Sequence, residues 1–300
     1  MVTRDPPSDV KLLLRKEVNF GCPVRFRRGG GCGCPILTYH HFDPPWSSCH
    51  THDPQGMIAL CPKHHPHADG GLWTKAQLKT FKKNPFVNDV IHVAWPWTSE
   101  TLIMKVGPSI IAGSGSAMRL DGRPVMRFYP REIDALGIRT VEFESDVRDE
   151  NGRQWLTITE SSFDLSLEGT TDLDVPPQAH RIVIRHKSGA YLHMQYRAIP
   201  FDKLLPLLRR SMTNADIAES ATNSIERVGG IDSDGNVPFV TFEGVVRSRH
   251  IEVSVKKNRM HFESQVPALQ PEFDWHSWVV NDVHRAIIRI RDGPELFSLG

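Results

Sequence analysis

Short apolar segments separated by polar and turn-forming residues run along the whole chain, and their texture changes near residue 90. Before that point the apolar positions predict a few short helices and strands. Thr74 stands where a helix N-cap is expected, and Asn84-Pro85 ends the segment that follows it. The helices are predicted at residues 11 to 18 and 75 to 83, and the strands at residues 36 to 41 and 57 to 60.

A third helix is predicted to start near Pro62 and to stop at the glycines at positions 70 and 71. It carries His64, His65 and Asp69. Two short strands followed by this helix suggest a β-hairpin with one helix packed across it.

Beyond residue 90 the pattern changes to short β-type runs separated by turns, which favours an antiparallel sheet, a sandwich or a barrel-like domain. Residues 203 to 227 form a leucine-containing helical insertion, and the turn-rich residues 228 to 236 mark a sub-boundary. The strands are predicted at residues 102 to 106, 124 to 128, 140 to 143, 155 to 159, 181 to 185, 239 to 242, 251 to 255 and 260 to 262.

We therefore predict an α+β protein with two parts. Residues 1 to 90 form a small N-terminal module, and residues 91 to 300 form a β-rich domain whose role the sequence does not identify. A chain of 300 residues with 39% hydrophobic residues is long enough for two folded cores.

Cysteine and histidine are concentrated in the N-terminal module. All five cysteines lie between residues 22 and 61, and two adjacent histidine pairs occur at positions 40 to 41 and 64 to 65. A disulfide framework would not be confined to one end of the chain. Because the chain opens without an apolar signal segment and has no apolar run long enough to cross a bilayer, we expect a reducing cytoplasmic setting and no membrane partner. In that setting, clustered Cys and His indicate metal binding.

Charge is also unevenly distributed. Residues 1 to 90 hold 12 Lys and Arg against 7 Asp and Glu, whereas the whole chain has a formal net charge of +1. A basic module is drawn toward polyanions, so we expect a nucleic acid as partner. The basic turn that carries Arg25, Arg27 and Arg28 is a candidate phosphate contact, and its glycines lack the Lys-Ser/Thr of a P-loop.

The spacing of the ligand-type residues separates two metal sites. His65 and Asp69 are four residues apart, so they share one face of the predicted helix and can hold an ion together with His40 from the facing strand. His64 points elsewhere on the helix. Together with Cys22, Cys32 and Cys61 it can complete a Cys3His structural zinc site, whereas Cys49 is expected to be a free thiol. The identified set is His40, His65 and Asp69 for the first site and Cys22, Cys32, Cys61 and His64 for the second.

Residues 17 to 83 resemble the HNH nuclease family, which has a ββα-metal fold. The resemblance rests on the pair His40-His41 at the end of a strand and on the Cys61-x-x-His64-His65 knuckle that opens a helix. It implies that His40 and His65 bind the catalytic metal, with Asp69 as the third ligand, and that His41 is the general base that deprotonates the attacking water.

Two positions depart from the family pattern. Gly56 stands where the family has an asparagine that orients the loop bearing the base, so His52, Asp53 or Gln55 is a candidate substitute. Cys22 and Cys32 are ten residues apart rather than three, and Cys34 then competes with Cys32 as a zinc ligand.

The expected activity is therefore hydrolysis of phosphodiester bonds, with DNA preferred over RNA on family likeness alone. A neutral histidine activates water, and a divalent cation, Mg, Mn, Ni or Zn, stabilises the developing charge. The architecture suggests a restriction or phage-defence effector in which the β-rich domain targets or gates cleavage. That domain leaves open an activating ligand or a homo-oligomer. The alternative is a non-catalytic zinc finger that binds nucleic acid or protein, joined to a ligand-sensing or oligomerisation domain.

Overall fold

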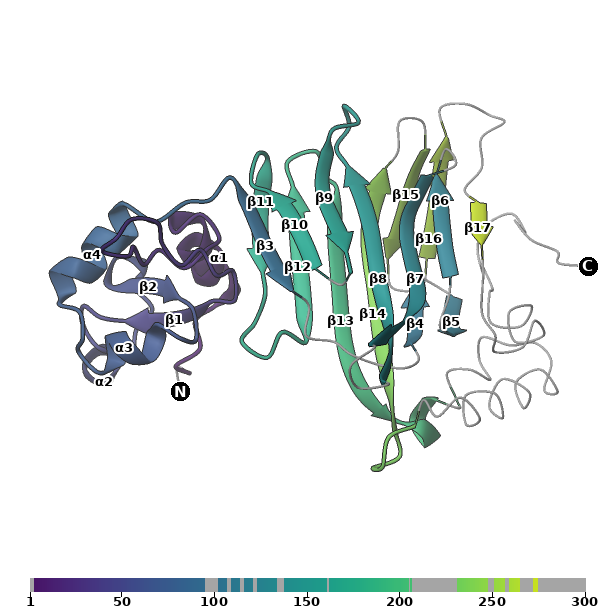
Figure 1. The fold of residues 1–300 in the computed structure, drawn as a ribbon. Helices are drawn as coiled ribbons and strands as arrows, with labels where there is room; N and C mark the ends of the chain where they lie inside the picture. The colour runs from purple at the N-terminus through teal and green to yellow at the C-terminus, as the bar shows by residue number, and fades with distance from the viewer. Residues whose placement is uncertain are drawn as a thin grey trace, which may run out of the picture. The chain divides into compact units, whose positions relative to one another are not determined.

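The computed structural model shows an α+β protein in which the described residues divide into two compact units (Figure 1). Unit 1 comprises Met1–Val93 together with Asp164–Lys187, and unit 2 comprises Ala94–Phe163 together with Ser188–Gly300. Unit 1 thus includes a segment that the sequence assigned to the β-rich domain. The structure describes residues 3–94, 102–106, 109–113, 116–120, 123–133, 138–160, 162–204, 206, 231–247, 251–256, 259–264 and 272–274.

The N-terminal part of unit 1 is a two-stranded hairpin with short helices around it (Figure 1). Strands β1 and β2 pair antiparallel, with His40 opposite Ile58 and His41 opposite Met57. The elements, in chain order, are α1 (Ser8–Glu17), β1 (Thr38–His41), α2 (Trp46–Cys49), the 3-10 helix η1 (Pro54–Gly56), β2 (Met57–Leu60), α3 (His65–Asp69) and α4 (Lys75–Lys83).

Strand β2 is the centre of the small core. All four of its residues are buried, and they pack against Leu14 and Val18 from α1 and Leu78 from α4. The local sequence explains why α4 begins where it does, since the Thr74 hydroxyl and the Gln77 side chain each bond the other residue's backbone N–H in a capping box. This agrees with the predicted bounds of β2 and α4.

Helix α3 begins later than expected. Residues 62 to 64 form a turn, His64 is the N-cap, and the helix runs from His65 to Asp69. Its N1 position is therefore His65, with Pro66 as the next residue, where a missing N–H costs nothing. The expected start near Pro62 was wrong by three residues, yet His65 and Asp69 still lie one turn apart.

The rest of unit 1 is built of short strands. Strand β3 (Val90–Ala94) pairs with β10 (Ser162–Ser166), and β11 (Thr170–Asp174) pairs antiparallel with β12 (Arg181–His186). Backbone hydrogen bonding connects the N-terminal module to these strands. Ile36 forms a parallel bridge with Val175, and the Leu37 N–H bonds the Val175 carbonyl.

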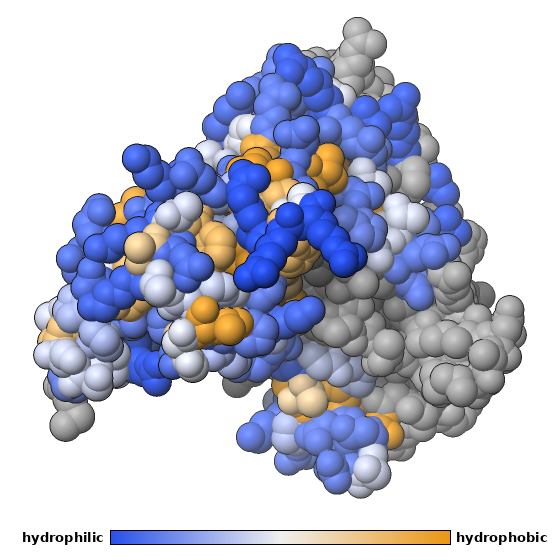
Figure 2. Space-filling view, turned by 60° about the vertical axis from the view of Figure 1, so that its left-hand side comes forward, coloured by the Kyte–Doolittle hydropathy of each residue, from blue (hydrophilic) through white to orange (hydrophobic). Residues whose placement is uncertain are grey.

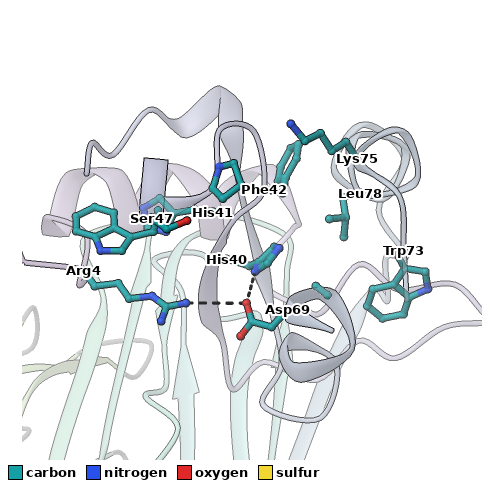
Figure 3. Close-up of a pocket in the computed structure, with 12 residues that line it drawn as sticks. Arg4, His40, His41, Phe42, Ser47, Asp69, Trp73, Lys75 and Leu78 are labelled. Carbon is teal, nitrogen blue, oxygen red and sulfur yellow. Dashed lines mark ion pairs between the residues drawn. The ribbon is translucent and has the colours of Figure 1, made fainter. Parts of the chain in front are cut away.

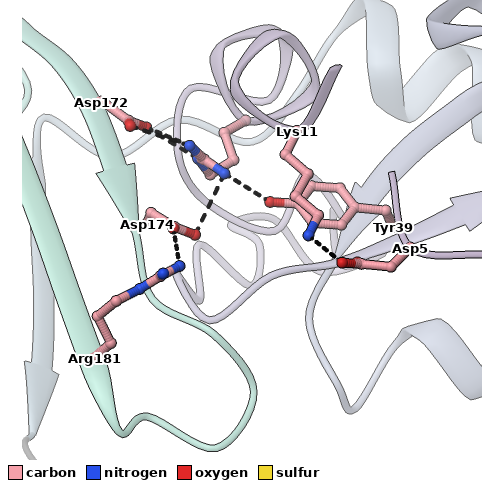
Figure 4. Close-up of polar contacts among 7 residues, drawn as sticks. Asp5, Lys11, Tyr39, Asp172, Asp174 and Arg181 are labelled. Carbon is pink, nitrogen blue, oxygen red and sulfur yellow. Dashed lines mark hydrogen bonds and ion pairs between the residues drawn. The ribbon is translucent and has the colours of Figure 1, made fainter. Parts of the chain in front are cut away.

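A buried ionic network ties α1 and β1 to β11 (Figure 4). The Arg15 guanidinium, with its side chain only 6% exposed, bonds both carboxylate oxygens of Asp172 at 2.8 to 3.1 Å. The same group lies 3.3 Å from Asp174 and donates to the Tyr39 hydroxyl at 2.9 Å. Tyr39 immediately precedes His40, so the strand that carries the histidine pair is anchored to β11 through Arg15.

Unit 2 is a β structure in which the described strands form two groups. One runs in the order β17-β6-β7-β8-β9, and the other runs β13-β14-β15-β16, with β4 parallel to β14 and β5 antiparallel to β4. The strands are β4 (Leu102–Val106), β5 (Ser109–Gly113), β6 (Ser116–Leu120), β7 (Arg123–Ile133), β8 (Ile138–Arg148), β9 (Gln154–Thr159), β13 (Tyr191–Pro200), β14 (Asn236–Arg247), β15 (Ile251–Lys256), β16 (Arg259–Ser264) and β17 (Glu272–Asp274).

The eight strands predicted beyond residue 90 all fall within observed strands. Seven described strands were not predicted: β3, β5, β6, β10, β11, β17 and β13, the ten-residue partner of β14. Of the predicted helix at residues 203 to 227, residues 203, 204 and 206 are helical. The remainder lies outside the described residues, as do residues 228 to 230 of the predicted sub-boundary. Residues 231 to 235 form a turn before β14, in which the Gly235 N–H bonds the Asp232 carbonyl.

The surface shown in Figure 2 is largely hydrophilic, and its apolar patches are small and scattered. In the part of the chain that the structure describes, no helix combines the length and apolar character that spanning a bilayer needs. The exposed large apolar side chains are Leu13, Phe26, Leu72, Val87 and Val90.

Replacing Arg15 with alanine should destabilise unit 1 by about 3–5 kcal/mol, because the buried Asp172 carboxylate would lose its counter-charge. Hydrogen exchange of the β1 and β2 amides in the full chain measures the effect. The matched control is Lys11→Ala in the same helix. Lys11 pairs with the exposed Asp5, so its loss should cost less than about 1 kcal/mol. Equal protection in both variants would contradict the anchoring role of Arg15.

Candidate metal centres

Cys22, Cys32, Cys61 and His64 bring four ligand atoms together in unit 1. Nδ1 of His64 lies 3.3 Å from the sulfurs of both Cys22 and Cys61, and the sulfurs of Cys32 and Cys61 are 3.8 Å apart. All four atoms lie within 4.8 Å of one another, and three of the four residues are buried. The group joins the end of α1, the basic turn, the end of β2 and the N-cap of α3.

These separations fit a tetrahedral zinc site. Four ligands at zinc bond lengths place two sulfurs about 3.8 Å apart and a sulfur and a nitrogen about 3.6 Å apart. The observed distances of 3.8 and 3.3 Å are close to those values. Three thiols and one imidazole are also a common donor set for structural zinc. The residues present therefore fit a zinc ion that cross-links four segments of the module.

The thiols of this group differ in the direction in which their pKa is shifted. Hydrogen bonds with Cys22, Cys32 and Cys34 lower the pKa of the Cys61 thiol, whereas hydrogen bonds with Cys32 and Cys61 raise the pKa of Cys22. Cys61 is therefore the first thiolate of the group, and a thiolate is the form that binds metal.

A second group, consisting of His40, His65 and Asp69, lies on the other side of the hairpin–helix contact. Nδ1 of His40 is 3.0 Å from Oδ1 of Asp69, and Nε2 of His65 is 3.5 Å from Oδ2 of Asp69. Both ring nitrogens are buried, and neither makes a hydrogen bond of acceptable geometry within the described residues. The two buried ring nitrogens face one half-exposed carboxylate, and this set of two imidazoles and a carboxylate fits a divalent cation.

The Thr38 hydroxyl selects the tautomer of His65. It donates its only proton to the Leu60 carbonyl at 2.9 Å, so it must accept at the 2.7 Å contact with Nδ1 of His65. The proton of the neutral His65 ring therefore sits on Nδ1, and Nε2 keeps a lone pair directed at the Asp69 side of the group. A hydrogen bond of this kind is what orients metal-bound histidines.

The electrostatic surroundings keep these rings neutral. Burial lowers the pKa of both His40 and His65, and the neighbouring His65 ring lowers that of His40 further. Neutral imidazoles bind divalent cations, whereas protonated ones do not.

His41 turns away from His40, as successive strand residues do. Its Nε2 lies 3.2 Å from Nδ1 of His52, and its ring lies against Trp46 with centroids 5.0 Å apart. Burial, followed by the charge of the neighbouring His52, lowers the pKa of His41 to about 4. The ring is therefore neutral at physiological pH and has a free lone pair.

His40, His41 and Asp69 line a common cavity of about 370 Å³ (Figure 3). Arg4 reaches in from the N-terminal segment and lies 3.9 Å from Asp69, and Lys75 of α4 lines the same cavity. Apolar walls complete it, formed by Phe42, Pro45, Trp46, Ala68, Trp73 and Leu78.

The structure places the remaining candidate residues as follows. Cys34 is near Cys61, but the four-atom group contains Cys32. The Asp53 side chain caps η1 by accepting from the Gln55 N–H, and Gln55 is exposed. The histidine that reaches His41 is thus His52.

The basic turn is closed by a bridge between Arg25 and Gly31, and the Arg25 guanidinium donates to the carbonyls of Asn84 and Pro85. Arg25 therefore holds the turn against the end of α4. Arg27 and Arg28 are exposed, as a phosphate contact requires.

Sequence reasoning missed three residues of this centre: Arg4, Thr38 and Lys75. Thr38 carried a local signal, because it precedes the histidine pair by two positions on a strand and so shares a face with His40. Arg4 and Lys75 reach the cavity from segments with no such pattern.

Replacing Cys61 with serine should release the zinc and unfold the N-terminal module, because folding and binding are one process in so small a core. Elemental analysis after dialysis and circular dichroism measure the two effects. Cys49→Ser is the control, since Cys49 lies outside the group. Full zinc content in the Cys61→Ser protein would contradict the assignment.

Replacing Thr38 with valine should weaken binding of the second divalent ion by about 10- to 100-fold, because Nδ1 of His65 loses its partner. Calorimetric titration with Mn²⁺ of protein that retains its tightly bound zinc measures the affinity. Thr38→Ser keeps the hydroxyl and should bind within a few-fold of the native protein. Unchanged affinity in the valine variant would argue against His65 as a ligand.

Comparison with known proteins finds no relative of this chain. No protein-family model matches the chain, and no curated protein or solved structure matches it.

Proposed function

We propose that this protein is a metal-dependent endonuclease that hydrolyses phosphodiester bonds of DNA through an HNH-like, ββα-metal module within residues 17 to 83. One observation carries the proposal: a single hairpin-and-helix unit holds two separate groups of metal-ligating residues, and His41 lies beside one of them.

The two groups differ in accessibility, as a structural and a catalytic site do. Cys22 is fully buried and Cys61 is 2% exposed, whereas the side chain of Asp69 is 48% exposed. Structural zinc sites are closed by four protein ligands, and catalytic sites keep open positions for water and substrate. A non-catalytic finger needs the first group alone and does not account for the second.

The cavity favours an anionic substrate. Arg4 and Lys75 line it together with two of the three ligand residues, His40 and Asp69, and the first 90 residues carry a surplus of five positive charges. Arginine and lysine in such a place attract and position a phosphate. The preference for DNA rests on likeness to the HNH family.

In the proposed reaction, His41 accepts the proton of the attacking water. Its neutral ring supplies the lone pair, and its fixed contacts with Trp46 and His52 hold it in place. A divalent ion held by His40, His65 and Asp69 supplies Lewis-acid stabilisation of the phosphate and of the leaving oxygen when bound. Arg4 adds positive charge at the same cavity.

At the level of the whole protein, we propose a restriction or phage-defence effector in which the β-rich part of the chain targets or gates cleavage. Within unit 1, Arg15 ties Asp172 and Asp174 of β11, a strand beyond residue 90, to Tyr39 next to His40, and this link supports the proposal.

The decisive experiment combines metal analysis of the purified full chain with a plasmid nicking assay in Mg²⁺, Mn²⁺, Ni²⁺ and Zn²⁺, on modified and unmodified DNA. Two ions per chain with nicking supports the nuclease. One tightly held zinc without nicking on any of these substrates supports the zinc-finger alternative and rejects the proposal.

Replacing His41 with alanine should reduce nicking by at least about 100-fold, because the general base is lost. Zinc content and the unfolding midpoint should stay near native, since His41 lies in neither ligand group. His67→Ala is the matched control, an exposed module histidine that also lies outside both groups. Full activity of the His41→Ala protein would refute the mechanism.

A further inference from the structure

We infer that His52 is the positioning residue for His41, and that a hydrogen-bond relay from the Thr3 carbonyl through His52 sets which nitrogen of His41 carries the lone pair. This inference deepens the proposed nuclease function and rests on it for its consequence, whereas the relay itself is tested independently of activity.

The relay starts at a group whose role is unambiguous. The Thr3 carbonyl can only accept, and it lies 2.9 Å from Nε2 of His52. The proton of the neutral His52 ring therefore sits on Nε2. A neutral imidazole has a single N–H, so Nδ1 of His52 is an acceptor.

The second link follows from the first. Nδ1 of His52 lies 3.2 Å from Nε2 of His41, and it has no proton to give. Nε2 of His41 must therefore donate, which leaves the lone pair of His41 on Nδ1. That nitrogen is buried and has no hydrogen-bond partner among the described residues. His41 thus lines the cavity with an Nδ1 lone pair that no described residue uses.

Trp46 keeps both rings in this relation. Its indole stacks on His52 with centroids 5.0 Å apart and an interplanar angle of 21°. The same indole packs at a tilt against His41, also at 5.0 Å. The relay therefore has a rigid apolar support rather than two freely rotating imidazoles.

The backbone shows why this task falls to His52. A Cβ on Gly56 would lie 1.9 Å from the Asp43 carbonyl oxygen, so the position that holds asparagine in the HNH family accepts no side chain here. The Gly56 carbonyl instead accepts from the N–H groups of Phe42 and Asp43 at 2.9 and 3.1 Å. The Gly56 carbonyl therefore holds the backbone after His41 in place. Neither of these hydrogen bonds involves the His41 ring, which another residue must orient.

The test reads the tautomers directly. Histidine labelled with ¹⁵N in the zinc-containing full chain, without added divalent ion, is observed at pH 8 by long-range ¹H–¹⁵N correlation. We expect His41 and His52 each to show a single neutral tautomer protonated at Nε2. In His52→Ala the His41 signal should become a tautomer mixture, and in His52→Asn the amide oxygen should restore the Nε2–H form.

Activity provides the second readout. His52→Ala should lower kcat for nicking by about 10- to 100-fold with KM little changed, and His52→Asn should recover most of the loss. His50→Ala is the matched control, because His50 contacts Trp46 from the same loop. Zinc content and the unfolding midpoint of each variant show that the module is folded.

The outcomes separate the two proposals. A native His41 protonated at Nδ1, or a His41 tautomer that does not change in His52→Ala, overturns the relay whatever the activity. The expected tautomers in a protein that never nicks DNA uphold the relay as a structural fact and reject the nuclease.

Discussion

The turn from Cys61 to His65 determines where both candidate metal centres lie. Cys61 ends the buried strand β2, His64 caps α3 and faces three thiols, and His65 begins the same helix while facing His40 and Asp69. Two adjacent histidines thus belong to different groups. Because α3 has only five residues, it lacks the length to be stable alone, so a metal ion shared by its N-cap and the cysteines would hold His65 and Asp69 in place.

The two centres divide the physical tasks of a small domain. The core around β2 is small, so burial of its apolar residues alone gives the module little stability. The buried group of thiols and His64 stabilises the module without occupying the cavity that His40, His41 and Asp69 line. The two groups of potential metal ligands therefore share no residue, although His64 and His65 are neighbours in the sequence.

Local regularities made much of this predictable. The spacing of His65 and Asp69 follows from the helical period, and the apolar run of β2 and the cap at Thr74 follow from short-range rules. The contacts that escaped prediction are distant in sequence or depend on rotamers. Arg15 meets Asp172 across 157 positions. The sequence named His52 as one of three candidates to orient His41 but could not choose among them, because the choice depends on how the segment between β1 and β2 folds. No periodic sequence pattern predicts contacts of this kind. The sequence of β13 likewise has no strand pattern that distinguishes it from its surroundings.

The pairing of Arg15 with Asp172 has a consequence for synthesis of the chain. When the ribosome has finished residue 93, both groups of metal-ligating side chains exist, but the carboxylates that neutralise Arg15 are still to be made. Unit 1 is complete only after residue 187 has emerged. A nascent N-terminal fragment therefore carries an unpaired guanidinium next to the strand that bears His40 and His41, and unit 1 can complete its fold only when more than half of the polypeptide has been translated.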